Sequence, residues 1–293
     1  MRPRGGRGVL PRISKQLVQP EELMDNDSPG TEALWALVRP HTGEQPAVEP
    51  TSRGNGSDVT AVITCENGPV FVKACPNRPG GRRASIIRER LVNPSVRTVS
   101  PKLLWHAQND EWIALGFEPV EGRSSDFTPV SADLPRIAAV LDQIKDLPLP
   151  PEACNWRETR WNRFADEKDA DLFKGDTLLF TDVNPDNFMI GNERIWVVDW
   201  SWPTRGAAFI DPACLVVQLI AAGHTAEAAE RWAAECRAWA DADSAAIDAF
   251  AAATLRMNRS QADRYPEAAW LEDMAAAART WASHRGVAER SAT

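Results

Sequence analysis

The chain has 293 residues, of which 43% are hydrophobic and 25% are charged, and its formal net charge is −8. This composition predicts a folded protein of one large domain or two smaller ones. The negative charge argues against non-specific binding of nucleic acids, because phosphates attract basic surfaces. No long uninterrupted apolar run occurs, so we expect no transmembrane helix.

The first segment, residues 1–24, is basic and lacks the apolar stretch of a secretory signal. We predict a disordered tail there, with an anion-binding arm as the functional alternative. The cysteines are odd in number and contain no CxxC pair, which favours reduced thiols in a cytoplasm over disulfides or a zinc site. They are Cys65, Cys75, Cys154, Cys214 and Cys236.

The following segment is predicted to be rich in strands. Residues 30–39 favour a short helix, and VTAVITC (59–65) and VFVKAC (70–75) favour two strands joined by the turn ENGP. RRASIIRERLV (82–92) has helical spacing and is expected to end before Asn93-Pro94, since the residue before a proline avoids the helical region. Another hairpin is predicted over 101–117, turning at 108–110.

From residue 131 the pattern becomes helical. SADLPRIAAVLDQI (131–144) predicts a helix with Asp133 as a candidate N-cap. In the stretch 211–285, rich in alanine and tryptophan, apolar residues recur every three or four positions, as in packed amphipathic helices. The tryptophans here and just upstream are expected in the core rather than as sugar-stacking platforms: Trp200, Trp202, Trp232, Trp239 and Trp270.

The stretch TDVNPDNFMIGNE (181–193) carries the chemistry. Its acids have EF-hand spacing, but Asn187 stands where that loop needs glycine, and the flanks read as strands rather than helices. A plain polar turn is the other alternative. If FMI (188–190) pairs with IWVVD (195–199) so that Ile190 faces Ile195, Asn187 lies opposite Val198. The hairpin then brings Asn187, Asp199 and the preceding Asp182 to one end.

Two carboxylates and an amide would then converge with no lysine or arginine close in sequence. Like charges ~4–5 Å apart repel by roughly 3–4 kcal/mol at an effective dielectric constant of about 20. A divalent cation would relieve that repulsion, and Mg²⁺ accepts such sparse oxygen sites when water and phosphates complete its shell.

Residues 178–200, LLFTDVNPDNFMIGNERIWVVDW, resemble the core of the aminoglycoside phosphotransferase and choline kinase-like family. That family shows H-G-D-x-x-x-x-N, a hairpin and then I-D-W/F, and it has a protein-kinase-like fold. The resemblance extends over about residues 50–220. It implies an α+β, bilobal chain, with a nucleotide-binding lobe at 25–118 and a mostly helical catalytic and substrate lobe at 119–293.

The resemblance also implies roles for single residues. Asp182 matches the catalytic aspartate, and Asn187 and Asp199 match the metal ligands. Lys73, on a strand, matches the phosphate-binding lysine, and Glu89, on the next helix, matches the acid that pairs with it.

Three further features match less specifically. Gly54, Gly56 and Ser57 of GNGS resemble a loop that covers the nucleotide. FEPVEG resembles the hinge, where Glu118 and Val120 would hold adenine through backbone groups. There is no GxxxxGK, so a P-loop is excluded.

Asp211, before an apolar helix, matches an aspartate that supports the catalytic loop, and we predict it to be an N-cap and a buried hydrogen-bond acceptor.

Three positions depart from the family pattern. Phe180 replaces the histidine two residues before the catalytic aspartate, Thr181 replaces the glycine, and Asp186 replaces a small residue. Phenylalanine can fill the volume but cannot donate a hydrogen bond. Asp186 is expected to point to solvent, with an outer-shell role at the metal as the alternative.

The resulting hypothesis is an ATP- and Mg²⁺-dependent phosphotransferase of the cytoplasm that acts on a hydroxyl of a small molecule. A pseudokinase or nucleotide-binding module acting through a protein partner, and a kinase that modifies a peptide of a natural-product pathway, are the alternatives. A protein Ser/Thr kinase is disfavoured by Asn184, which stands where those enzymes carry lysine, and by the short segment between Asp199 and Asp211.

The helical stretch contains many acids, as a polycationic aminoglycoside would require, but helical acids usually form a solvated face. The sequence therefore specifies neither the acceptor nor the choice between ATP and GTP, and it predicts no oligomeric state.

Overall fold

A computed structural model describes residues 31–43, 47–50, 59–66 and 68–288. The predicted disordered tail, 1–24, and the predicted nucleotide-covering residues Gly54, Gly56 and Ser57 lie outside the described residues. The elements of the N-terminal part are α2 (Thr31–Thr42), β1 (Ala47–Pro50), β2 (Val59–Cys65), β3 (Gly68–Pro76), α3 (Gly81–Val96), β4 (Leu103–Gln108) and β5 (Trp112–Phe117).

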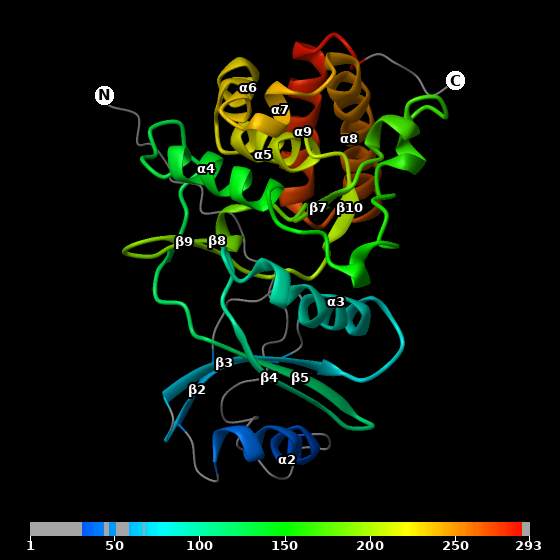
Figure 1. Ribbon diagram of the computed structural model, residues 1–293. Helices are drawn as coiled ribbons and strands as arrows, with labels where there is room; N and C mark the ends of the chain where they lie inside the picture. The colour runs from blue at the N-terminus through cyan, green and yellow to red at the C-terminus, as the bar shows by residue number, and fades with distance from the viewer. Residues whose placement is uncertain (1–30, 44–46, 51–58, 67, 289–293) are drawn as a thin grey trace.

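The N-terminal part is an antiparallel sheet with the strand order β1-β2-β3-β5-β4. Side chains alternate across β3, as the period of a strand requires. Val70, Val72 and Ala74 pack with α2, whereas Phe71 and Cys75 lie in a second cluster with a residue of α3. Figure 1 shows the consequence: α2 covers the outer face of the sheet, and α3 lies between the sheet and the helices of the C-terminal part. Lys73 shares the α3 side of β3.

The helix α3 runs further than the sequence predicted. It passes through Asn93 and Pro94 and ends at Val96, so the predicted end at residue 92 is wrong. Val92 and Val96 are fully buried in the core of the C-terminal part. The amide of Asn93 donates to the carbonyl of Pro101 (2.8 Å), and its oxygen accepts from the Leu103 N–H (2.9 Å). These tertiary contacts outweigh the local preference against a helical residue before proline.

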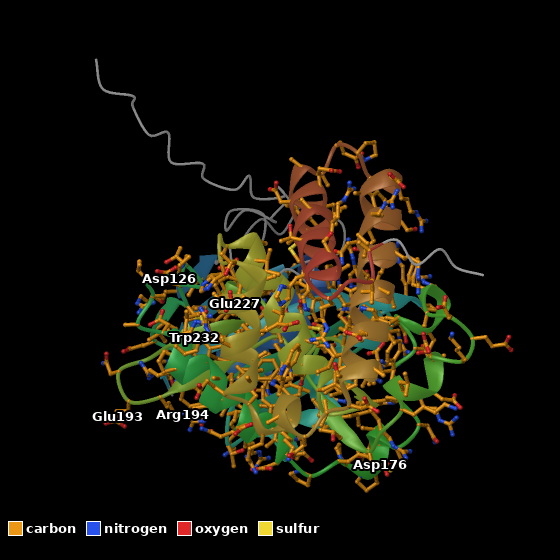
Figure 2. The ribbon with its side chains drawn as sticks, turned by 90° about the horizontal axis from the view of Figure 1, so that it is seen from above. Asp126, Asp176, Glu193, Arg194, Glu227 and Trp232 are labelled. Carbon is orange, nitrogen blue, oxygen red and sulfur yellow. The ribbon has the colours of Figure 1, made fainter. Side chains whose placement is uncertain are left out.

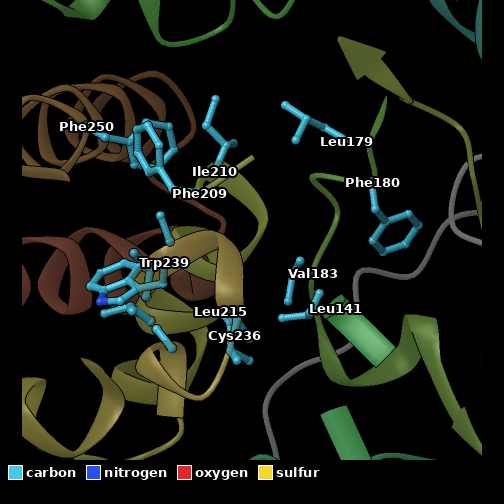
Figure 3. Packing of buried hydrophobic residues seen from close by; sticks show 14 of the residues in the cluster. Leu141, Leu179, Phe180, Val183, Phe209, Ile210, Leu215, Cys236, Trp239 and Phe250 are labelled. Atoms are coloured by element: carbon cyan, nitrogen blue, oxygen red, sulfur yellow. The ribbon is translucent and has the colours of Figure 1, made fainter. Parts of the chain in front are cut away.

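The C-terminal part is mostly helical and holds the largest hydrophobic cluster, part of which Figure 3 shows around Phe180, Phe209 and Phe250. The α-helices and strands of the C-terminal part are β6 (Arg123–Ser124), α4 (Leu134–Lys145), β7 (Thr177–Leu179), β8 (Phe188–Ile190), β9 (Ile195–Val197), β10 (Thr204–Gly206), α5 (Ile210–Ala221), α6 (Ala226–Ala234), α7 (Arg237–Ala240), α8 (Ser244–Arg264) and α9 (Ala269–His284). Strand β6 pairs with β8, β8 with β9, and β7 with β10.

Two local expectations for this part need correction. Asp133 is the N-cap residue of α4, as predicted, but its side chain makes no capping hydrogen bond; the carboxylate instead accepts hydrogen bonds from both terminal nitrogens of Arg123, at 2.6 and 2.7 Å. Trp202 and Trp270 are exposed (42% and 37%), so the core prediction is wrong for them. Trp202 lies in the short segment after Asp199, where its ring reaches the first turn of α3: a Cβ added to Gly81 would lie 3.4 Å from it.

All five cysteines are free. Within the described ranges, no helix combines the length and the apolar character needed to cross a membrane.

Candidate active site

The hairpin β8–β9 positions one side of the candidate site. Ile190 pairs with Ile195 and Phe188 with Val197, and the Val198 N–H donates to the carbonyl of Asn187 (2.9 Å). This is the predicted register. It places Asn187 and Asp199 at the same end of the hairpin, whereas the turn at the other end carries Glu193 and Arg194 outward, as Figure 2 shows.

Asp182 is held by two amide side chains. The Nδ2 group of Asn187 donates to Asp182 Oδ2 and to the Asp182 carbonyl, each at 2.9 Å, and the Nδ2 group of Asn184 donates to Oδ1 at 3.1 Å. Burial, together with the charge of Asp199, raises the pKa of Asp182. The amide nitrogen of Asn187 is thus committed to Asp182, and its Oδ1 atom has no partner in the described part of the chain.

The cation of the site comes from the sheet. Lys73 Nζ lies 2.8 Å from Glu89 Oε2 and 2.9 Å from Asp199 Oδ1, and Lys73 is only 3% exposed. Burial alone would lower the pKa of Lys73, but the Asp199 and Glu89 carboxylates raise it above its ordinary value, so the amine stays charged. Burial raises the pKa of Glu89, whose carboxylate also accepts the backbone N–H of Trp200. The structure therefore brings Lys73, Glu89 and Asp199 together around one buried ion-pair network.

The hinge segment presents free backbone groups. The Glu118 N–H donates to the Lys102 carbonyl (2.9 Å). Among the described residues, none donates to the Glu118 carbonyl and none accepts from the Val120 N–H. The two groups that the resemblance assigns to adenine are therefore available to a ligand.

The loop before Asp182 is ordered without the histidine. Asp211 is the second residue of α5, which Phe209 precedes as N-cap, so the predicted N-cap role is wrong. Its predicted role as buried acceptor is confirmed: the carboxylate accepts the backbone N–H groups of Phe180 (2.9 Å) and Thr181 (2.7 Å). Burial raises the pKa of Asp211 to about 6.

Aromatic packing replaces the missing histidine. Phe180 is 1% exposed, and its ring centroid lies 4.9 Å from that of Trp200 and 5.8 Å from that of Phe188. Thr181 stands at φ 63°, a conformation that costs a β-branched residue free energy and that the glycine of the family pattern would adopt freely. Asp186, the third departure, is exposed as expected and accepts the Ser124 hydroxyl (2.9 Å).

Two site residues were missed by the sequence reasoning. Arg160 donates through Nη2 to the Thr181 hydroxyl and to Glu158 Oε2. The Glu158 side chain is 1% exposed and also accepts the Thr204 hydroxyl (2.7 Å). No periodicity marks these residues, because they lie in a long connection without a regular helix. Their only sequence signal is the alternation of charges in RETR, 157–160.

Few oxygen groups at the site could bind a metal ion. Among the residues with described coordinates, no three Asp, Glu, His or Cys side chains converge as a ready-made metal site. The oxygen ligands at hand are the Asp199 carboxylate and the Asn187 amide oxygen, beside Asp182. Such a sparse set fits Mg²⁺, which takes one or two protein carboxylates and completes its shell with water and phosphate oxygens.

No protein-family model matches the chain, and no curated protein does. Solved structures match with probability 1.00. Choline kinase from Streptococcus pneumoniae has a TM-score of 0.60 at 12% identity, over 86% of this chain and 98% of that one.

Two antibiotic-modifying enzymes are similar in fold. Spectinomycin phosphotransferase, in complex with ADP and spectinomycin, has a TM-score of 0.54 at 13% identity, over 86% and 93% of the two chains. An aminoglycoside phosphotransferase from Alicyclobacillus acidocaldarius has a TM-score of 0.52 at 14% identity, over 86% and 94%. The chain therefore has the fold of the choline kinases and aminoglycoside phosphotransferases, a protein-kinase-like fold with a sheet-rich N-terminal and a helical C-terminal part.

Proposed function

We propose that this protein is an ATP- and Mg²⁺-dependent phosphotransferase that phosphorylates a hydroxyl of a small molecule. The observation that carries the proposal is the network of Lys73, Glu89 and Asp199 beside the Asp182–Asn187 pair. A buried lysine shared by two carboxylates next to a third provides the cation and the oxygen ligands that phosphoryl transfer from a metal-bound nucleotide requires. The similar folds of choline kinase and spectinomycin phosphotransferase support the same class of reaction.

The residues at the site fit a nucleotide and a metal ion. The unpaired Glu118 carbonyl and Val120 N–H would hold adenine, Lys73 would neutralise phosphate oxygens, and Asn187 and Asp199 would hold Mg²⁺. When bound, ATP with Mg²⁺ supplies the phosphoryl group and the positive charge that stabilises its transfer. The division into a nucleotide-binding lobe at 25–118 and a catalytic lobe at 119–293 belongs to the same proposal.

Asp182 acts on the acceptor. Its carboxylate accepts a hydrogen bond from the acceptor hydroxyl and orients the oxygen, whose lone pair forms the new bond to the γ-phosphorus. The bond from that phosphorus to the β–γ bridging oxygen breaks, its electron pair leaves with ADP, and the hydroxyl proton passes to Asp182. The raised pKa of Asp182 favours this proton transfer. Asn184 and Asn187 fix the carboxylate, which matters because phosphoryl transfer depends mainly on positioning and charge.

The acceptor is proposed to be a small molecule rather than a protein. Strand β10 and helix α5 follow Asp199 closely, which leaves no long segment on which an extended peptide could dock. The pseudokinase alternative was motivated by Phe180 and Asp186. Asp211 and the aromatic cluster supply the loop order that the histidine would give, and Asp186 lies exposed beside Ser124.

The test compares the wild-type protein with Asp182→Asn and Asp199→Asn. We expect ADP formation with Mg²⁺ and a hydroxyl acceptor to fall in Asp182→Asn by about 10²–10⁴-fold, the usual contribution of a positioned acid or base. The thermal shift on adding ATP with Mg²⁺ should persist in Asp182→Asn and weaken in Asp199→Asn. Retained turnover in Asp182→Asn would overturn the assignment of Asp182, and a nucleotide-dependent shift without turnover in any acceptor screen would favour the pseudokinase.

A further inference from the structure

Two segments that border the catalytic loop are basic, although the chain as a whole is acidic. The first ten residues of α3, GRRASIIRER (81–90), contain four arginines, and their only acid, Glu89, is engaged by Lys73. The segment WRETRWNR (156–163) contains three arginines, and its only acid, Glu158, is engaged by Arg160. Helix α3 packs against the short 3₁₀ helix at 151–153 that leads into this second segment. The two segments together contain seven arginines, against two ion-paired acids and the exposed Glu152 of the 3₁₀ helix, so positive charge predominates here in a chain with a net charge of −8.

Arg88 forms no direct ion pair with a described residue, although the carboxylate of Glu158 is near enough to act on its charge. The Arg88 guanidinium lies over Trp156, with Cζ 5.2 Å from the ring centroid. No described residue forms an ion pair or a hydrogen bond with it. Arg88 is half-buried, and burial together with the nearby Arg160 lowers its pKa, an effect that the charge of Glu158 offsets only in part. The fold thus holds this arginine in a partly desolvated place where a bound anion would stabilise it.

Arg160 joins this cation to the catalytic loop. Its Nε and Nη2 groups bind Glu158, and Nη2 also donates to Thr181, which precedes Asp182. Its Nη1 group has no partner among the described residues, and the side chain is 38% exposed. The charge of Arg160 acts on the Asp182 carboxyl. One edge of the guanidinium is therefore fixed and the other is available to a ligand beside the proposed catalytic aspartate.

Two acids of the helical stretch that could attract a polycation, Glu227 and Glu230, form ion pairs with arginines of the same stretch. Glu230 pairs with Arg285 at 3.1 Å and accepts the Trp281 N–H at 2.7 Å. Glu227, on the outside of α6, pairs with Arg231 at 3.0 Å. Neither acid is therefore free to bind a cation at the catalytic loop, whereas Arg160, which contacts that loop, keeps an Nη1 group without a partner among the described residues.

We propose that the acceptor carries an anionic group, a carboxylate or a phosphate, which Arg88 and Arg160 bind while the acceptor hydroxyl lies at Asp182. This inference rests on the proposed phosphotransferase function and names the substrate class of that same site. Planar guanidinium groups match the oxygen pairs of carboxylates and phosphates, so two of them set both the position and the orientation of the acceptor.

The test uses four compounds with one ring skeleton: glucose, glucosamine, glucuronate and glucose 6-phosphate. They are neutral, cationic, a carboxylate and a phosphate. Binding is measured by calorimetry in the presence of ADP and Mg²⁺, so that the nucleotide site does not compete for the anions. We expect at least one of the two anions to bind tenfold or more tightly than glucose, and the comparison of glucuronate with glucose 6-phosphate distinguishes a carboxylate from a phosphate site.

Arg88→Gln is the decisive variant, and Arg97→Gln is its matched control. Both remove one positive charge, but Arg97 is the exposed C-cap residue that follows α3, nine residues and so about 13 Å along the helix axis from Arg88. We expect Arg88→Gln to weaken binding of the anion at least tenfold and Arg97→Gln to leave it unchanged. Tighter binding of glucosamine, equal or undetectable binding of all four compounds, or anion binding that survives in Arg88→Gln would overturn the proposal.

Measurements of turnover test the anionic acceptor and the phosphotransferase function independently of each other. If the anions bind through Arg88 but no acceptor is phosphorylated above the level of Asp182→Asn, the anion site is supported and the phosphotransferase function is refuted. If a cationic acceptor is phosphorylated and Arg88→Gln does not change its KM, the phosphotransferase function is supported and the proposal of an anionic acceptor is refuted.

Discussion

Replacing Lys73 by methionine removes the single cation between two buried carboxylates. Methionine keeps most of the length and the apolar stem of the lysine, so the change is mainly one of charge. Glu89 Oε2 and Asp199 Oδ1 each lie within 2.9 Å of the lost nitrogen. The geometry therefore leaves two like charges close together in a place from which water is largely excluded.

Two estimates give the same loss in the free energy of unfolding for Lys73→Met. The two oxygens are at most about 5.8 Å apart, so both charges repel by about 3 kcal/mol at an effective dielectric constant of about 20. If Glu89 takes up a proton instead, protonating at pH 7 a carboxyl group whose ordinary pKa is 4.5 costs about 3 kcal/mol as well. We therefore expect Lys73→Met to lower the free energy of unfolding at pH 7 by about 3 kcal/mol, in the range of about 3–5 kcal/mol for breaking a buried pair.

The assay is urea unfolding of the wild-type protein, Lys73→Met, Glu89→Gln and the double variant at pH 6, 7 and 8. The loss in Lys73→Met should shrink toward pH 6, because protonation of Glu89 becomes easier by about 1.4 kcal/mol for each pH unit. The double variant should regain most of the stability, since glutamine carries no charge and can still accept the Trp200 N–H. A loss below about 1 kcal/mol, or no recovery in the double variant, would refute the reasoning that Lys73 is the charge-balancing group.

Two further outcomes test the catalytic loop. Phe180→His should lower the free energy of unfolding by about 2–3 kcal/mol in urea titrations, because the imidazole would be buried against Trp200 and Phe188 without a hydrogen-bond partner. Unchanged or improved stability and turnover would show that the loop still accommodates the histidine. The pKa of Asp211, raised from 3.8 to about 6, means that the folded protein binds this proton more tightly than the unfolded chain, so its contribution of about 3 kcal/mol is present below about pH 4 and is lost as the pH rises to about 6. Thermal unfolding from pH 4 to 7.5 should show this fall in the wild-type protein relative to Asp211→Asn, and parallel pH profiles of the two proteins would contradict it.

Local patterns in the sequence were enough to predict the β8–β9 hairpin, which positions Asn187 and Asp199. A strand has a fixed period of two, so pairing Ile190 with Ile195 determines where Asn187 and Asp199 lie. The alternation along β3 likewise follows from the sequence. These features depend on neighbours in the chain, and a single sequence contains that information.

Features that depend on distant partners were not predicted. The end of α3 is decided by the burial of Val92 and Val96 in another part of the molecule. Asp133 occupies the N-cap position of α4, but its carboxylate binds Arg123 instead of the helix. The contact of Asp211 with the loop before Asp182 was implied only by the family resemblance, because no local pattern encodes it. Arg160 reaches the catalytic loop from a connection without regular structure, and no local pattern encodes such a contact.

The path of α3 restricts how the two parts of the protein can move apart. Ile86, near the start of this helix, packs with the sheet, whereas Val92 and Val96 are fully buried in the core of the helical part. Pulling the whole helix away with the sheet would expose both valines, at about 1.5–3 kcal/mol for each side chain. The buried end of α3 therefore opposes separation of the two parts. Any hinge motion about that end would displace Arg88 and the Lys73–Glu89 pair more than the two valines, and it would have to break the ion pair between Lys73 and Asp199.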